Sequence, residues 1–112
     1  MAQNYNAVQR WAYAFPSGTA TVGFDTAAQV GIVHLKDCEA QINLAFFESG
    51  TVTTGYSFDV EVSHDRTNWV MKDTDVDAEE VVSISDGPWT YVRVTAETWV
   101  GGTGDVVVTV GW

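Results

Sequence analysis

The sequence predicts an all-β protein, a single antiparallel β-sandwich or jelly roll of about seven or eight strands with an extended N-terminal arm. Apolar and polar residues alternate with a period of two through most of the chain, and no segment shows a convincing helical period. Turn-forming residues interrupt this alternation at short intervals. A chain of 112 residues can bury one hydrophobic core, so we expect a single folded domain.

The clearest strand covers residues 56–63. Tyr56, Phe58, Val60 and Val62 project from one face of this strand, and the polar residues between them project from the other. The same alternation predicts further strands at Thr19–Phe24, Ile32–Leu35, Ile42–Phe46, Trp69–Lys72, Val81–Ser85, Trp89–Glu97 and Val106–Trp112.

Clusters of Gly, Pro, Asn, Asp and Ser separate the expected strands. Such short connections join antiparallel strands, whereas a parallel sheet requires crossover segments of a dozen or more residues. The sequence therefore favours antiparallel pairing. The turn-rich stretches are Pro16–Gly18, Glu48–Gly50, Asp65–Asn68, Asp86–Pro88 and Gly101–Gly104.

Residues 1–15 form the expected N-terminal arm, and residues 16–112 form the expected β-sandwich domain. Trp11, Tyr13 and Phe15 alternate with alanines, so an extended chain would present all three rings on one face. Two interpretations stay open. The segment is either an edge strand of its own sandwich or an arm that reaches a neighbouring molecule, since broad aromatic faces are seldom left in water.

The formal net charge of −10 weighs against two classes of partner. Nucleic-acid binding depends on Lys and Arg that neutralise phosphates, and here the few basic residues are scattered singly. Anionic membrane surfaces are disfavoured for the same reason. We therefore expect neither a nucleic-acid partner nor a membrane partner.

Cysteine usage and the first residues of the chain indicate a reducing compartment. Cys38 is the single cysteine, so no intrachain disulfide can form. Residues 1–10 lack the basic-then-apolar order of a signal peptide, and no apolar run is long enough to span a bilayer. The protein is expected to be made in a cytoplasm and to remain there until it assembles.

The sequence contains no recognisable catalytic, cofactor or metal motif. The acidic run 73–80 lacks the glycine and glutamate that an EF-hand loop requires, and a charge-protected loop or edge explains it better. His34, Cys38 and His64 have no zinc-ligand spacing. No serine elbow or phosphate-binding loop is present. We therefore predict a protein that is not an enzyme and has no catalytic, cofactor-binding or metal-binding residues.

Aromatic residues are the remaining functional signal. Tryptophans at strand ends usually cover the core, and this is the simpler interpretation of Trp69 and Trp89. Exposed aromatic rings can also anchor a protein interface. The predicted protein-interface residues are Trp11, Tyr13, Phe15 and Trp99.

Three segments carry a resemblance to a known class of protein. Residues 60–70 end a strand in Ser63-His64-Asp65, turn, and restart at Asn68-Trp69. Residues 86–94 read Gly-Pro, aromatic, Tyr, aliphatic, Arg, Val, and residues 101–110 place a glycine loop before a valine strand. These segments, roughly the last 60 residues, resemble capsid decoration or cement β-sandwich proteins of tailed phages.

The residues of this pattern have structural roles. Asp65 and Asn68 can bond the backbone of their own turn. Trp69 is expected to lie against the sheet, and Arg93 is expected to pair with an acid on a neighbouring strand.

The resemblance implies a virion structural protein, a capsid decoration protein that binds the outer shell surface between capsomers and stabilises it. The implied partners are the major capsid protein and sister copies, as a homodimer or homotrimer. One alternative is a phage tail or fibre component, because similar proteins from the same gene neighbourhoods belong to tails and fibres. The other is a carbohydrate-binding β-sandwich module, because similar signatures occur in discoidin-like, sugar-binding sandwiches.

Overall fold

The computed structural model describes residues 18–49, 56–77, 80–99 and 104–112. These residues form antiparallel strands, and none of them lies in a helix that could cross a membrane. The strands are β1 (Thr19–Phe24), β2 (Val30–His34), β3 (Ile42–Ser49), β4 (Ser57–Ser63), β5 (Val70–Val76), β6 (Val81–Ile84), β7 (Tyr91–Thr98) and β8 (Asp105–Gly111).

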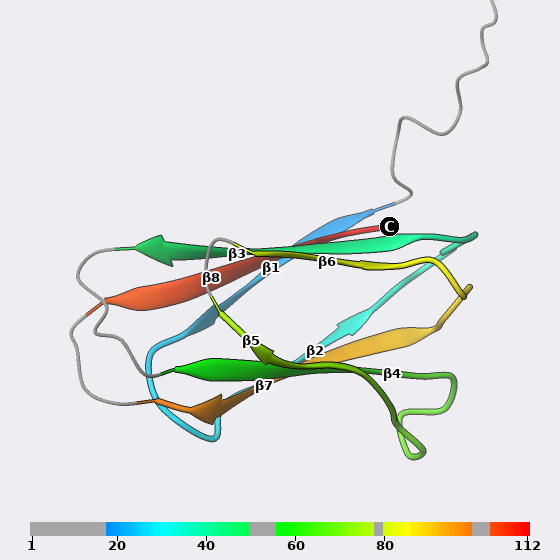
Figure 1. Cartoon of the computed structure of the whole chain (residues 1–112). Coiled ribbons are helices and arrows are strands. Elements are labelled where there is room, and N and C mark those ends of the chain that lie inside the picture. The colour runs from blue at the N-terminus through cyan, green and yellow to red at the C-terminus, as the bar shows by residue number, and fades with distance from the viewer. Residues whose placement is uncertain (1–17, 50–55, 78–79, 100–103) are drawn as a thin grey trace, which may run out of the picture.

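The strands form two facing sheets, as Figure 1 shows. One sheet has the order β1-β8-β3-β6 and the other has the order β2-β7-β4-β5. Consecutive strands thus alternate between the sheets except for β4 and β5, which pair within one sheet, and this is the jelly-roll arrangement. The predicted all-β sandwich is confirmed.

The core lies between the two sheets and follows the predicted alternation. Phe58 is fully buried, with its ring centroid 5.2 Å from that of Phe24 and 5.4 Å from that of Phe46. Because these three rings come from β4, β1 and β3, they join the two sheets. The surrounding core residues are Val33, Leu35, Ile42, Leu44, Val60, Val62, Val76, Val82, Ile84, Val92, Val94, Ala96, Val106, Val108 and Val110.

The sandwich is closed along the side where β1 and β2 meet. Gly31 of β2 has a hydrogen atom where any other residue would have a Cβ, and that Cβ would collide with the side chain of Val22 on β1. Glycine thus permits the close approach of the two edge strands. On the opposite side, β5 and β6 are the edge strands of their sheets.

The strand boundaries differ from the predicted ones at several ends. Trp69 and Trp89, expected to begin strands, precede β5 and β7, and β3 continues to Ser49. The pairing of β5 with β4 shifts register twice, so the period-two pattern fails along β5. Bulges of this kind redirect side chains, which a sequence pattern cannot reveal. Residues 1–15, the expected arm, lie outside the described residues.

Replacing Phe58 with alanine should lower the free energy of unfolding by about 3–5 kcal/mol, because the cavity would open at the junction of both sheets. Phe47→Ala is the matched control, since Phe47 is 48% exposed on β3. It should cost about 1 kcal/mol or less. Urea unfolding of both variants checks this expectation, and equal losses would contradict the described core.

Candidate functional site

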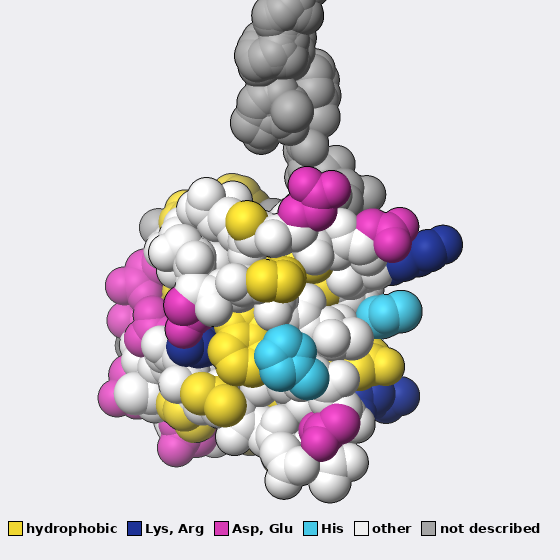
Figure 2. Space-filling view, turned by 90° about the vertical axis from the view of Figure 1, so that its right-hand side faces the viewer, with side chains coloured by type: hydrophobic (Ala, Val, Ile, Leu, Met, Phe, Trp, Pro, Cys, Tyr) yellow, Lys and Arg dark blue, Asp and Glu magenta, His cyan; other side chains and the backbone are white. Residues whose placement is uncertain are grey.

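Aromatic, basic and histidine side chains gather at one end of the sandwich. This end, here named the histidine end, is formed by residues 35–41, 64–69 and 85–90, which connect β2 to β3, β4 to β5, and β6 to β7. Figure 2 looks onto it and shows both histidine side chains beside hydrophobic ones.

The chain termini of the described domain also lie at the histidine end (Figure 1). Gly18 and Trp112 exchange backbone hydrogen bonds of 2.9 and 3.0 Å, and the Trp112 indole Nε1–H donates to the Lys36 carbonyl at 2.7 Å. A Cβ on Gly18 would collide with the Trp112 ring. Residues 1–17 therefore join the sandwich at this end.

Trp89 is central to the site. The His64 imidazole stacks on its ring with centroids 4.5 Å apart, and the Lys72 Nζ lies 5.4 Å from the ring centroid. The indole N–H donates to Asp86 at 3.2 Å, and Lys72 forms an ion pair with the same carboxylate. The hydrogen bond from Lys72, followed by that from Trp89, lowers the pKa of Asp86 below its ordinary value.

Tyr91 and Arg93 extend this surface onto the outer face of β7. His34 stacks on Tyr91 at 5.1 Å, and the Arg66 guanidinium lies 5.8 Å from the Tyr91 ring centroid. Arg93 lies 4.2 Å from the ring centroid of Trp69. Histidine and guanidinium groups on aromatic rings form a surface rich in the residue types that dominate protein interfaces.

Arg93 is also fixed by an ion pair across the sheet. Its Nε and Nη2 groups both donate to one oxygen of Glu61 on β4, at 3.0 and 2.8 Å. The expected pairing of Arg93 with an acid on a neighbouring strand is confirmed, as is the expected position of Trp69 against the sheet.

The turn after β4 holds His64 and Arg66 in place. The Asp65 carboxylate accepts backbone N–H bonds from Thr67 at 2.9 Å and Asn68 at 2.8 Å, and an amide bond from the Asn68 side chain at 2.7 Å. The expected bonding of Asp65 to the backbone of its own turn is therefore confirmed, whereas the Asn68 side chain bonds the Asp65 carboxylate and not the backbone. The bonds from Asn68 and Thr67 hold the pKa of Asp65 well below its ordinary value.

A hollow of about 260 Å³ opens at the histidine end. Both imidazoles line it together with Cys38, although the three residues have no zinc-ligand spacing in the sequence. Among the described residues, no group of three His, Cys, Asp or Glu side chains is arranged to hold a metal ion. The remaining lining residues are Leu35, Asp37, Pro88, Trp89 and Thr90.

The opposite end of the sandwich, here named the acidic end, has a different charge. Within the part of the chain that the structure describes, Lys, Arg and His lie at or near the histidine end. Carboxylates dominate the acidic end, where a hydrogen bond with Asp59 raises the pKa of Glu97, assisted by the negative charges of Asp59 and Asp75. The acids towards this end are Asp25, Glu48, Asp59, Asp75, Asp77, Glu80, Glu97 and Asp105.

The predicted interface residues do not form one cluster. Trp11, Tyr13 and Phe15 lie outside the described residues. The described chain begins at Gly18, which lies at the histidine end. Trp99 lies at the acidic end, half-buried, with its ring centroid 5.6 Å from that of Tyr56 and 6.4 Å from that of Phe58. It covers that end of the core, and its interface role stays a prediction.

Sequence reasoning missed the residues of the histidine end. His34, His64 and Tyr91 are separated in the sequence and belong to no motif for a binding site. The one feature that could have grouped them is their position in the strands. Each lies at or near the end of an expected strand, and these strand ends lie on the same side of the sandwich. That signal becomes usable once the strand directions are known.

The comparisons with known proteins give a fold and no family. No family model matches the chain, and no curated protein sequence matches it significantly. The crystal structure of the SPBc2 prophage-derived protein YomS is similar, with a TM-score of 0.59 at 7% identity over 85% of this chain and 95% of that one. A structure of pili from Bacillus endospore appendages aligns over 85% and 84% of the chains with 14% identity, but its TM-score of 0.42 is too low to indicate a shared fold.

Replacing Asp65 with asparagine should lower the melting temperature at neutral pH. The pKa of Asp65 is depressed by folding, so the ionised carboxylate stabilises the protein above the ordinary pKa of 3.8, and this stabilisation is lost as pH falls towards the folded pKa. The difference between the proteins should therefore shrink below about pH 4. Asp37→Asn, in the exposed 35–41 loop, is the control and should leave the melting curves nearly unchanged.

Glu97→Gln should raise the melting temperature at neutral pH. The pKa of Glu97 is raised by folding, so the stabilising protonated form is fully present below the ordinary value of 4.5 and is lost as pH rises through the folded pKa. The gain should disappear in melts below pH 4.5. Glu39→Gln, an exposed site without a partner among the described residues, should show no such pH dependence. A Glu97→Gln protein that is less stable than the parent at pH 7 would contradict the inferred repulsion between Glu97 and the carboxylates of Asp59 and Asp75.

Proposed function

We propose that this protein is a structural component of a virus-type particle, and specifically a capsid decoration protein that stabilises the outer surface of a tailed-phage shell. It acts by binding other proteins and is not an enzyme. Its partners are the major capsid protein and sister copies of this chain, bound between capsomers. A tail or fibre component is the second candidate within the same class of particle.

The observation that carries the proposal is the division of the sandwich into two chemically different ends. The histidine end combines Trp89, Tyr91 and Arg66 with the attachment point of residues 1–17. Its cations lie beside acids such as Asp86 and Glu61, so strong repulsion of a protein surface is avoided. Aromatic and arginine side chains with balanced charge are typical of protein interfaces.

The acidic end suits exposure to solvent. A surface of carboxylates is soluble, and it repels like surfaces on other copies. A protein that binds a shell by its histidine end would point its carboxylates away from the particle. This orientation would favour solubility of a densely covered particle.

The fold and the origin of a similar structure are consistent with this proposal. YomS, which shares the fold, is described as prophage-derived. The resemblance of residues 60–70 and 86–94 to decoration proteins concerns the turn and the strand that build the histidine end. The same segments thus carry both the resemblance and the proposed contact surface.

The mechanism is the burial of surface area by many weak-to-moderate contacts. A stable protein interface covers about 800 Å² on each partner. The aromatic segment Trp11–Phe15 and the rings of the histidine end would supply the anchors. Many copies on one particle gain further through multivalency.

Deletion of residues 1–15 should leave a folded sandwich that no longer co-sediments with particles in a density gradient. The core residues lie at or beyond position 24, so the deletion removes no core contact among the described residues. Particles from the phage or lysogen that encodes the chain serve as the binding partner. Arg66→Glu should weaken co-sedimentation of the full-length chain, whereas Asp105→Lys, at the acidic end, is the matched control.

Several outcomes would contradict the proposal. Full-length protein that never co-migrates with heads would exclude decoration, and co-migration with tails would favour the second candidate. Specific retention on a polysaccharide, lost in Trp99→Ala, would instead indicate a carbohydrate-binding module.

A further inference from the structure

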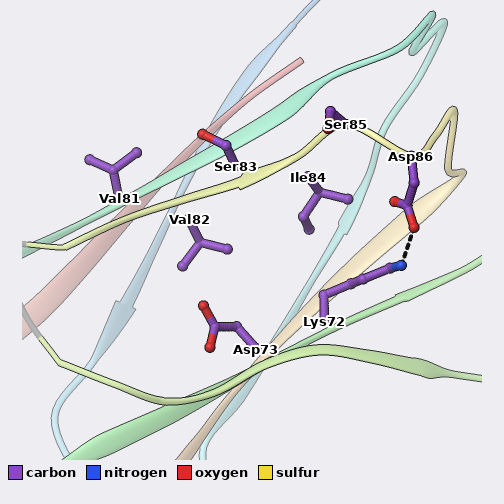
Figure 3. A pocket seen from close by; sticks show the side chains of 8 residues that line it. All are labelled: Lys72, Asp73, Val81, Val82, Ser83, Ile84, Ser85 and Asp86. Carbon is purple, nitrogen blue, oxygen red and sulfur yellow. Dashed lines mark hydrogen bonds and ion pairs between the residues drawn. The ribbon is translucent and has the colours of Figure 1, made fainter.

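The open side of the sandwich between β5 and β6 carries the most exposed large hydrophobic residue of the described domain. Val81, at the start of β6, is 68% exposed. A groove of about 330 Å³ runs between the two strands and is lined by Val82, Ile84 and the β5 residues Lys72 and Asp73. Figure 3 shows Val82 and Ile84 directed towards β5, whereas Val81 and Ser83 point away from it.

The backbone of β6 has a free edge for hydrogen bonding. Among the residues that the structure describes, β6 pairs with β3 on one side only, and the Phe46 amide donates to the Glu80 carbonyl at 3.0 Å. In an antiparallel ladder, alternate residues turn their backbone groups towards the same neighbour. Glu80, Val82 and Ile84 thus face β3, and the N–H and C=O groups of Val81 and Ser83 face outwards. An additional strand could pair with these two residues.

We propose that the free edge of β6 receives residues 10–15 of a second copy of this chain, which adds to the sheet as an extended strand. This inference rests on the proposed structural role, in which sister copies are partners. The Trp11, Tyr13 and Phe15 rings, on one face of an extended segment, would cover the groove, and Ala12 and Ala14 would lie on the Ser83 side.

Charge complementarity supports this occupant. Residues 1–17 contain Arg10 and no Asp or Glu, so the remainder of the chain carries all of its acidic side chains. Asp77 and Glu80 precede β6, and Asp86 follows it. Asp86 already forms an ion pair with Lys72, so the carboxylates that would attract Arg10 are those of Asp77 and Glu80, which have no ion-pair partner among the described residues. Antiparallel pairing of two β6 strands would instead bring Glu80 close to the partner's Asp86, and these like charges disfavour that contact.

The reach of the chain favours a second copy over the same molecule. Gly18 enters β1, which lies at the far edge of the sheet from β6. A strand added outside β6 would be four strand spacings from β1, or about 19 Å. Phe15 is three residues from Gly18, and three residues span at most about 11 Å. The segment therefore cannot pair with β6 of its own chain along its whole length.

Sedimentation equilibrium of the full-length chain tests the inference. The parent protein should self-associate, and Val81→Lys should weaken association at least tenfold because the new cation opposes Arg10 and disrupts the apolar edge. Arg10→Glu should also weaken self-association. Ile32→Lys, at a 40% exposed position on β2, is the matched control and should have little effect. Circular dichroism verifies that each variant is folded.

A disulfide-trapping experiment identifies the contact itself. In a Cys38→Ser background, chains with Ser83→Cys are mixed with differently tagged chains with Ala12→Cys or Ala14→Cys. Cross-strand Cα distances of about 5.5 Å permit a disulfide, so a mixed dimer should form under mild oxidation. Chains with Thr21→Cys, on β1, replace Ser83→Cys in the control mixture.

The inference fails if the parent is a monomer at all concentrations, or if association is lost in Ile32→Lys and retained in Val81→Lys. It also fails if Ser83→Cys forms no mixed disulfide with either alanine position. Particle co-sedimentation of Val81→Lys separates the two proposals. If Val81→Lys still binds particles and the parent protein is a monomer, the β6 contact is overturned and the proposed decoration role is retained.

Discussion

The packing of two sheets on one apolar layer is the constraint on which the rest of this structure depends. Phe24, Phe46 and Phe58 meet at the centre of that layer, and the buried valines of β4, β7 and β8 surround them. Because alternate residues of each strand satisfy the core, the residues between them are free to vary. The outer faces and the loops can therefore carry function without altering the fold, as in other β-sandwich domains.

The separation of core residues from the residues of the outer faces and loops allows the two ends of the sandwich to differ in chemistry. At the histidine end, side chains are held by specific contacts: His64 on Trp89, His34 on Tyr91, and Asp65 within its own turn. At the acidic end, a hydrogen bond with Asp59 and the negative charge of that carboxylate raise the pKa of Glu97. Ordered aromatic groups suit recognition of a protein surface, and crowded like charges suit contact with water.

The edges of the sheets distinguish this molecule from a closed barrel. Gly31 lets β2 approach β1 closely, which seals one side of the sandwich. On the other side, the outer edge of β6 has no strand partner among the described residues and lies beside a groove, with carboxylates before and after the strand. Natural proteins commonly protect edge strands with charges. Charges at both ends of β6 discourage pairing with an identical strand while they attract a segment that carries Arg10.

The sequence by itself determined the strand positions to within a few residues, the antiparallel character of the sheets, the turn at Asp65 and the pairing of Arg93 with an acid. These features depend on local periodicity and on side chains that bond nearby backbone, which a sequence displays directly. The strand order, the convergence of His34, Cys38 and His64 on one hollow, and the separation of Trp99 from the attachment point of residues 1–17 were decided by the tertiary structure. They depend on contacts between residues far apart in the chain, because the choice of neighbouring strands follows from which faces and edges pack best together.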